Sequence, residues 1–293
     1  TLGAHQSQIW YVTIASSGTA TAFGNLLSTY NGFAGCASDV RGVFAGGFSS
    51  GSYMNTIQYV TIASTGNAIS FGTLTTNKQA TGACSNAAQA VGPFATSSAM
   101  ALFAGGFATR RIASIQYVNV DTTGNSKQFG DLSLFTSSVG SCSSTTRALF
   151  GGGFAAPSVG TTTIITYLEY ASNGKSISFG NLTAARNTLG GFNSATRGCF
   201  VGGFDSNTIG AFNTIDYVTI ASTGNALTFG SLTVAAQGGG CCSSPTRGVR
   251  GGSYNTQTAT IDYVTIASTG NATSFGSLTV ARGPVGACST STR

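Results

Sequence analysis

The sequence predicts an all-β protein built from six repeated units, and three observations support this prediction. First, the motif Tyr-Val-Thr-Ile-Ala-Ser, or a close variant of it, recurs through the 293 residues. Second, β-branched and aromatic residues alternate with polar ones inside each unit, which is the period of a half-buried strand. Third, no stretch has a sustained helical period. Four short strands in each of several repeats are the sequence signature of a β-propeller.

The units keep the same register at several positions. A Phe-Gly pair follows each anchoring Tyr, and a Cys follows each of those Phe residues, except where Phe192 replaces it. An Arg comes after the Cys, except at Gln89. We therefore expect residues 1–293 to form a single six-bladed domain. The anchoring tyrosines are Tyr11, Tyr59, Tyr117, Tyr167, Tyr217 and Tyr263.

Each unit is expected to hold four antiparallel strands. Residues 261–268 alternate apolar and polar side chains and end at a Thr-Gly-Asn turn, and residues 272–278 form a second alternating run. Residues 286–290 predict a third strand, and residues 42–47 a fourth that ends in a Gly-Gly pair. The second unit has an extra segment between Ala88 and Ala99, which we interpret as a loop insertion.

The two ends of the chain complement each other. The sequence stops at Arg293, directly before the place of a Gly-Gly strand, and it starts at Thr1, shortly before the Tyr11 strand. We expect the C-terminus to supply the innermost strand of the sixth blade and the N-terminus the other three. Pairing of the terminal strands would then close the ring and remove open sheet edges.

These motifs resemble the kelch repeat. The resemblance consists of a strand ending in Gly-Gly, a later Tyr, an aromatic residue on the next strand, and then Leu-Thr-x-x-Arg. Arg186 and Arg282 stand where the last Arg of that motif would be, whereas Phe stands where kelch repeats usually have Trp. The segments IDYVTIASTGNA, FGSLT and CSSxTR are similar to segments of kelch-like proteins encoded by bacteriophages, marine ones among them. The resemblance covers the whole chain and implies a kelch-like β-propeller associated with a virion or tail fibre.

Composition excludes several classes of partner. The chain has 13 Lys and Arg against 7 Asp and Glu, and only Arg110 and Arg111 are adjacent cations. Nucleic-acid binding needs clustered cations, so none is expected. No apolar run approaches the ~18 residues of a membrane helix, so membrane insertion is not expected either. The low charge suits a protein on a virion or outside the cell.

Catalytic chemistry has little support in this sequence. His5 is the only histidine, which removes most zinc, copper and general-base sites. Copper-oxidase chemistry on a kelch scaffold needs histidine ligands, so the resemblance does not carry that activity here. Asp216 and Asp262 share one repeat position, yet Trp10 and Gln58 occupy it elsewhere. We expect no enzyme activity, no catalytic residue, no metal and no cofactor.

The cysteines are expected to be free thiols. Their number, seven, is odd, which argues against a disulfide framework. Five of them share one repeat position that also accepts a Phe, so the position is an apolar packing slot. These five are Cys36, Cys84, Cys142, Cys242 and Cys288.

A repeated arginine lies at the turn between the first and second strands of most units. One interpretation is a site for an anion or a partner on this face. The other, which we favour, is that each guanidinium bonds turn carbonyls and stacks on a neighbouring aromatic ring. The arginine series consists of Arg41, Arg147, Arg197, Arg247 and Arg293.

The variable loops after each Gly-Gly pair are expected on the opposite face. The Phe directly after Gly-Gly is expected to plug its blade. Aromatic and cationic residues deeper in the loops suit sugar stacking or a protein contact. These candidate ligand-binding or partner-binding residues are Tyr53, Arg110, Arg111, Phe212, Tyr254 and Asn255.

Two functions follow from this pattern. The first is a non-enzymatic recognition module of a phage virion or extracellular structure, which binds a host-surface glycan or protein through the loops. The alternative is a structural virion decoration or assembly protein that docks on another virion subunit. Binding to host cells distinguishes the first from the second.

Overall fold

The computed structural model describes residues 6–86, 99–156, 160–208, 210–254, 258–283 and 286–290. Within these ranges every regular element is a β-strand, and all strand pairs but one are antiparallel. The predicted all-β, antiparallel class is therefore confirmed. The described residues include no helix that could span a membrane. The predictions for His5, Asn255, Arg293 and residues 88–98 lie outside the described residues.

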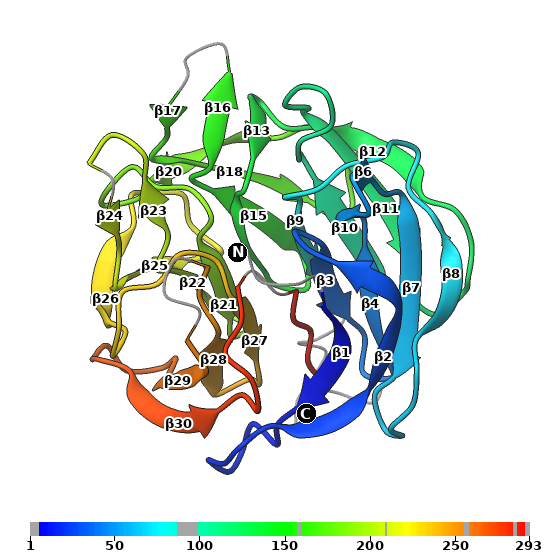
Figure 1. The fold of residues 1–293 in the computed structure, drawn as a ribbon. Helices are drawn as coiled ribbons and strands as arrows, with labels where there is room; N and C mark the ends of the chain where they lie inside the picture. The colour runs from blue at the N-terminus through cyan, green and yellow to red at the C-terminus, as the bar shows by residue number, and fades with distance from the viewer. Residues whose placement is uncertain are drawn as a thin grey trace.

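Five sheets repeat one strand order, in which the four strands of a unit lie side by side in chain order (Figure 1). We name each sheet by its first strand. The β3 sheet comprises β3 (Ala34–Ala37), β4 (Arg41–Ala45), β7 (Thr56–Thr61) and β8 (Ile69–Thr73). The β9 sheet comprises β9 (Gly82–Ser85), β10 (Met100–Ala104), β11 (Ser114–Asn119) and β12 (Lys127–Asp131), with β19 (Gly174–Lys175) added in parallel.

The remaining sheets follow the same plan. The β14 sheet comprises β14 (Gly140–Ser143), β15 (Arg147–Gly151), β18 (Ile164–Glu169) and β20 (Ile177–Asn181). The β21 sheet comprises β21 (Gly190–Asn193), β22 (Arg197–Val201), β25 (Thr214–Thr219) and β26 (Leu227–Ser231). The β27 sheet comprises β27 (Gly240–Ser243), β28 (Arg247–Gly251), β29 (Thr260–Thr265) and β30 (Thr273–Ser277). The expected strands at 42–47, 261–268 and 272–278 thus appear as β4, β29 and β30, each somewhat shorter.

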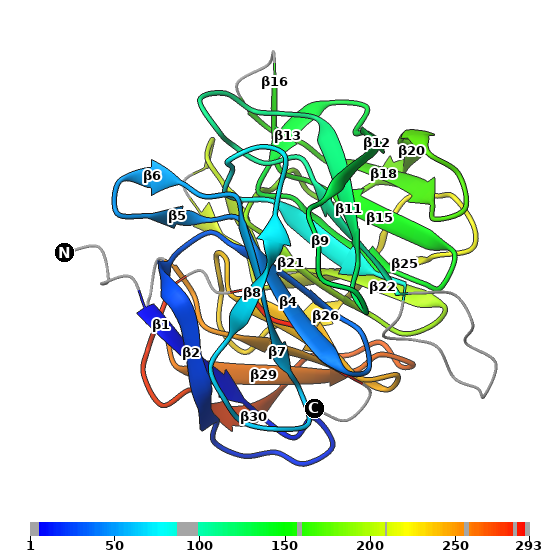
Figure 2. The same cartoon turned by 90° about the vertical axis from the view of Figure 1, so that its right-hand side faces the viewer.

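Short strands extend the loops after the Gly-Gly pairs. In Figure 2 the β5–β6 hairpin projects beyond the sheet from which it rises. Positive φ angles at Gly46 and Gly47, of 68° and 106°, turn the chain out of β4 into this hairpin, and such angles favour glycine. The loop strands are β5 (Phe48–Ser49), β6 (Ser52–Tyr53), β16 (Phe154–Ala156), β17 (Gly160–Thr161), β23 (Phe204–Asp205) and β24 (Gly210–Ala211). The short strand β13 (Phe135–Ser137), between β12 and β14, pairs with β16.

The Tyr-to-Phe spacing of the repeat has a structural cause. In the β3 sheet, Ile57 pairs with Gly72 and Gln58 with Ser70, so Phe71 is the extra residue of a β-bulge. Its ring lies edge-on to the Tyr59 ring, with centroids 5.8 Å apart. Every other third and fourth strand pair repeats this contact, at Tyr11–Phe23, Tyr117–Phe129, Tyr167–Phe179, Tyr217–Phe229 and Tyr263–Phe275.

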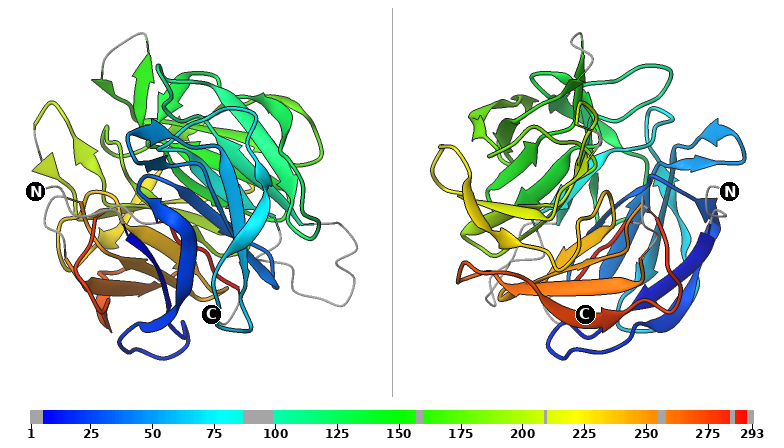
Figure 3. Two further views of the ribbon diagram at one scale, coloured as in Figure 1. Left: turned by 45° about the vertical axis from the view of Figure 1, so that its right-hand side comes forward. Right: turned by 60° about the vertical axis from the view of Figure 1, so that its left-hand side comes forward.

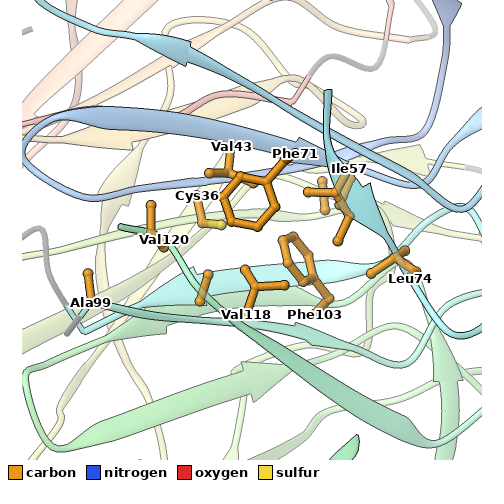
Figure 4. Close-up of a cluster of buried hydrophobic side chains, with 12 residues drawn as sticks. Cys36, Val43, Ile57, Phe71, Leu74, Ala99, Phe103, Val118 and Val120 are labelled. Atoms are coloured by element: carbon orange, nitrogen blue, oxygen red, sulfur yellow. The ribbon is translucent and has the colours of Figure 1, made fainter. Parts of the chain in front are cut away.

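Hydrophobic cores lie between neighbouring sheets rather than within one. Figure 4 shows the core between the β3 and β9 sheets, where Val43 and Phe71 face Phe103 and Val118. Corresponding clusters fill the β9–β14, β14–β21 and β21–β27 junctions. Each sheet is therefore stabilised mainly by burial against its two neighbours.

The outer strands also join neighbouring sheets. The Phe71 carbonyl in β8 accepts a hydrogen bond from the Gly124 N–H of the next sheet, and other junctions repeat the bond. A Cβ on Gly72 would collide with the Gly124 carbonyl. This close approach explains why Gly follows the Phe in every unit. The repeated bonds join Phe179 to Gly224, Phe229 to Gly270, and Phe275 to Gly18.

The first and last described segments, residues 6–30 and 286–290, lie between the β27 and β3 sheets. Figure 3 shows the two-stranded sheet of β1 (Gln6–Tyr11) and β2 (Thr21–Tyr30) between the β29–β30 side and the β7–β8 side. Apolar clusters lie on both sides of this pair. The predicted strand at 286–290 is not a regular strand, although these residues lie beside β3 and Ser289 hydrogen-bonds to Ser243 of β27. Residues Thr1–His5, expected to supply a second strand, lie outside the described residues.

Candidate functional site: the variable loops and the arginine series

The arginine series has the contacts that its structural interpretation expects. Arg197 donates from Nη1 to the Ile266 carbonyl of the next sheet at 2.8 Å, and its guanidinium lies 4.5 Å from the centre of the Tyr217 ring. Each of these arginines thus links two sheets and lies over the tyrosine of its own. Arg41, Arg147 and Arg247 make the same pair of contacts, with Val120 and Tyr59, Ile220 and Tyr167, and Ile14 and Tyr263.

At the opposite end of the second strands, loop residues from three successive sheets form one continuous row. The ring of Tyr53 in β6 lies edge-on to the ring of Phe107 in the next sheet's loop, with centroids 5.9 Å apart. Phe107 forms a backbone bridge with Arg111, whose guanidinium lies 5.0 Å from the centre of the Phe154 ring in β16. We call Tyr53, Phe107, Arg111 and Phe154 the loop row. All four are half-buried.

The other candidate residues are dispersed. Arg110 is exposed beside the loop row. Tyr254 is 45% exposed and lies near Gly283, on the side where the chain ends meet. The ring of Phe212 is half-buried and lies 5.7 Å from the guanidinium of Arg186. The sequence did not predict this contact, because the two residues are distant in the chain.

Arg186 belongs to a buried cation position that recurs after the fourth strand. Its Nη2 donates to the Asp216 carboxylate at 2.8 Å and to the Phe200 carbonyl of the next sheet at 3.3 Å. Burial lowers the pKa of Arg186, and the Asp216 charge opposes that shift. Lys78 occupies the same position and donates from Nζ to the Phe103 carbonyl at 3.3 Å. Burial lowers the pKa of Lys78 to about 7.

The position shared by Asp216 and Asp262 joins neighbouring sheets. Asp216 accepts a hydrogen bond from the backbone N–H of Thr183, and Asp262 one from the hydroxyl of Thr233. Gln58 accepts in the same way from the Leu27 N–H. The sequence indicates this role of the position, because a polar residue recurs directly before the Tyr in an otherwise apolar strand. Burial raises the pKa of Asp262, which has no ion-pair partner within 4 Å among the described residues.

All seven cysteines are free thiols: six lie on or beside the first strands, and Cys199 lies on the second strand β22. Cys36, Cys84 and Cys142 are buried, while Cys242 and Cys288 are partly buried. Burial raises the pKa of the Cys84 thiol to about 12, so it stays protonated and unreactive near neutral pH. No group of three or more His, Cys, Asp or Glu side chains suited to a metal ion occurs in the described ranges.

Comparison with known proteins identifies no family for this chain. No protein-family model matches this sequence, and no curated protein matches it. The function is therefore argued from the geometry of the loops and sheets.

Proposed function

We propose that the chain is a six-bladed kelch-like β-propeller that serves as a non-enzymatic recognition module of a phage virion or extracellular structure. The shared strand order of five sheets supports the fold, as do the apolar clusters on both sides of β1–β2. In this fold β1 and β2 are the outer strands of the sixth blade, and the blade closes the ring between the β27 and β3 sheets.

The loop row is the observation on which the recognition function rests. Loops from three sheets bring Tyr53, Phe107, Arg111 and Phe154 into one row, with Arg110 exposed beside them. Aromatic side chains offer flat apolar faces with little conformational entropy to lose, and arginine adds directed hydrogen bonds. Such a surface suits a host-surface glycan or a protein loop.

Binding of the purified chain to bacterial surface glycans and to intact candidate host cells tests this function. Arg110→Ala and Tyr53→Ala are expected to weaken saturable binding by about tenfold or more, as for residues central to an interface. Lys127→Ala removes an exposed cation on β12, outside the loops, and should bind like the wild type. Melting temperatures identify any variant that fails to fold. Unchanged binding by both loop variants would refute loop recognition.

A specific observation favours the alternative, a structural virion decoration. Apolar side chains are exposed at one register position of three outer strands, where Ile69 is 54%, Ile177 56% and Leu227 60% exposed. Exposed apolar residues at regular intervals suit docking on a neighbouring subunit. Under this alternative, Leu227→Lys blocks co-assembly with a virion protein, and the chain has no affinity for cells.

A further inference from the structure

The guanidinium of Arg111 in the loop row differs from those of the arginine series. Arg197 lies over the Tyr217 ring and at the same time donates a hydrogen bond to a backbone carbonyl of the next sheet. Arg111 lies over the Phe154 ring in a similar way, 5.0 Å from its centre. None of the described residues, however, accepts a hydrogen bond from the Arg111 side chain, and its Nε is buried without a partner. The arginines that combine ring contact and carbonyl bond as Arg197 does are Arg41, Arg147 and Arg247.

The stack on Phe154 orients the donors of Arg111 without using them. The N–H groups of a guanidinium lie in its plane, whereas a ring contact uses its face. Phe154 therefore fixes the plane of Arg111 and leaves the N–H groups available to an acceptor. A buried N–H without an acceptor is unfavourable, so the fold holds this guanidinium in place at a cost. An acceptor from outside the described chain would remove that cost.

The charge of the loops indicates the sign of that acceptor. Arg110 and Arg111 are the cations of the loops that follow the Gly-Gly pairs, and Asp205 is their one acid. The Asp205 carboxylate already accepts hydrogen bonds from the Asn207 N–H and the Thr208 hydroxyl. Among the described residues no carboxylate lies within 4 Å of Arg110 or Arg111. An anion complements this surface, and a planar carboxylate matches the fork of a guanidinium.

The backbone of the loop row favours a sugar over an extended peptide. The segment that carries Phe107 is paired on both sides by backbone bridges, and so is the segment that carries Phe154. Neither segment offers a free edge to which a peptide could add as a further strand. A ligand must therefore be held by side chains. The rings of Tyr53 and Phe107, half-buried and in contact with each other, provide apolar surface of the kind on which a pyranose ring stacks.

We propose that the loop row binds a carboxylate-bearing saccharide, that is, a hexuronic acid or sialic acid unit of an acidic glycan. The sugar ring lies against Tyr53 and Phe107, and its carboxylate accepts hydrogen bonds from Arg111. Arg110, exposed beside the row, adds attraction to the same charge. This inference rests on the proposed recognition function and specifies the ligand of that site.

Isothermal titration calorimetry of the purified chain with short oligogalacturonate and oligosialic acid tests the ligand class. Saturable binding is expected for at least one of them. The methyl ester of the bound oligomer keeps the sugar and removes the charge, so it should bind about tenfold more weakly or less. Oligoglutamate keeps the charge without the sugar and should also bind at least about tenfold more weakly. Absence of binding to both acidic oligomers, or equal binding of the ester or of oligoglutamate, would overturn the proposal.

Two substitutions of one residue separate hydrogen bonding from charge. Arg111→Met keeps an apolar side chain over Phe154 and removes the donors, so binding of the acidic oligomer should weaken about tenfold. Arg111→Lys keeps the charge but lacks the planar fork, and its loss should be nearly as large. Lys127→Met removes an exposed cation on β12, outside the loops, and should bind like the wild type. Unchanged binding by Arg111→Met would refute the role of its guanidinium.

Stability provides a readout that a structural arginine would not give. Arg111→Met removes an unsatisfied buried donor, so it should leave the melting temperature unchanged or raise it, whereas Arg197→Met should lower it. Equal losses of stability, together with unchanged oligomer binding, would make Arg111 a packing residue and overturn the proposal. If Tyr53→Ala abolishes binding to cells while the methyl ester binds as well as the acid, loop recognition stands and only this inference fails. If the chain binds neither cells nor any of these oligomers, both fail.

Discussion

The β21 sheet and the β1–β2 pair carry the same repeat, yet their interiors differ. At the β14–β21 junction, Arg186 meets both a carboxylate and a second-strand carbonyl. At the β27–β1 junction, the equivalent Arg282 stacks on Trp10 beside a cavity. Likewise Ile215 is fully buried, whereas Ile9 is half-buried. The difference teaches that the second strand, which contacts both its neighbours, completes the core of a unit.

The largest expected effect comes from breaking the buried ion pair. Arg186→Met leaves the Asp216 carboxylate buried without its cation, which should lower the free energy of unfolding by about 3–5 kcal/mol. Arg282→Met removes only a ring contact and should cost far less. Urea denaturation of both variants measures the difference. Equal losses would show that the two junctions are equivalent after all.

Core truncation tests the same contrast without charges. Ile215→Ala should cost about 2–5 kcal/mol, because it empties a closed core. Ile9→Ala should cost about 1 kcal/mol, since part of its side chain is already in contact with solvent. Thermal unfolding of both proteins checks the ratio.

Lys78 sharpens the comparison. Like Arg186, it donates to a carbonyl of the next sheet's second strand, but among the described residues it has no carboxylate partner. Its folded-state pKa, about 7, lies below the ordinary value of 10.5, so the unfolded chain binds a proton that the folded chain has released. Stability should therefore rise by about 1–2 kcal/mol from pH 7 to pH 8.5 and fall as the pH drops towards 7. Subtracting the profile of Lys78→Met isolates this contribution. A difference that does not vary with pH would mean that Lys78 is charged throughout this range.

The smallest effects concern the two sets of arginines. Arg197→Ala loses one carbonyl bond and a ring contact, which should cost about 1 kcal/mol. Arg247→Ala loses two carbonyl bonds and a ring contact, so its cost should be equal or slightly larger. Arg110→Ala should change stability by less than about 0.5 kcal/mol. Differential scanning calorimetry of the three variants measures these costs, and a marked loss at Arg110 would contradict its exposed position.

The sequence by itself determined the parts of the fold that recur. The Arg, Tyr and Phe positions predicted strands, turns and the stacking of arginine on an aromatic ring, because that contact joins residues of one unit at a fixed spacing. The same regularity marked the cysteines as packing residues. The loop candidates Tyr53 and Arg111 could be named from the sequence. Phe107 and Phe154 directly follow Gly-Gly and were expected to plug their blades, so their contacts with neighbouring loops were not predicted.

Only the tertiary structure decided which residues from different units meet. Phe212 lies over Arg186, and Trp10 lies under Arg282, although Trp10 and Arg282 belong to the first and last units of the chain. Residues 286–290 are not a regular strand, although they stand at the repeat position of the other first strands. Local alternation sets the tendency to form a strand, and the packing of neighbouring sheets decides whether that strand is completed.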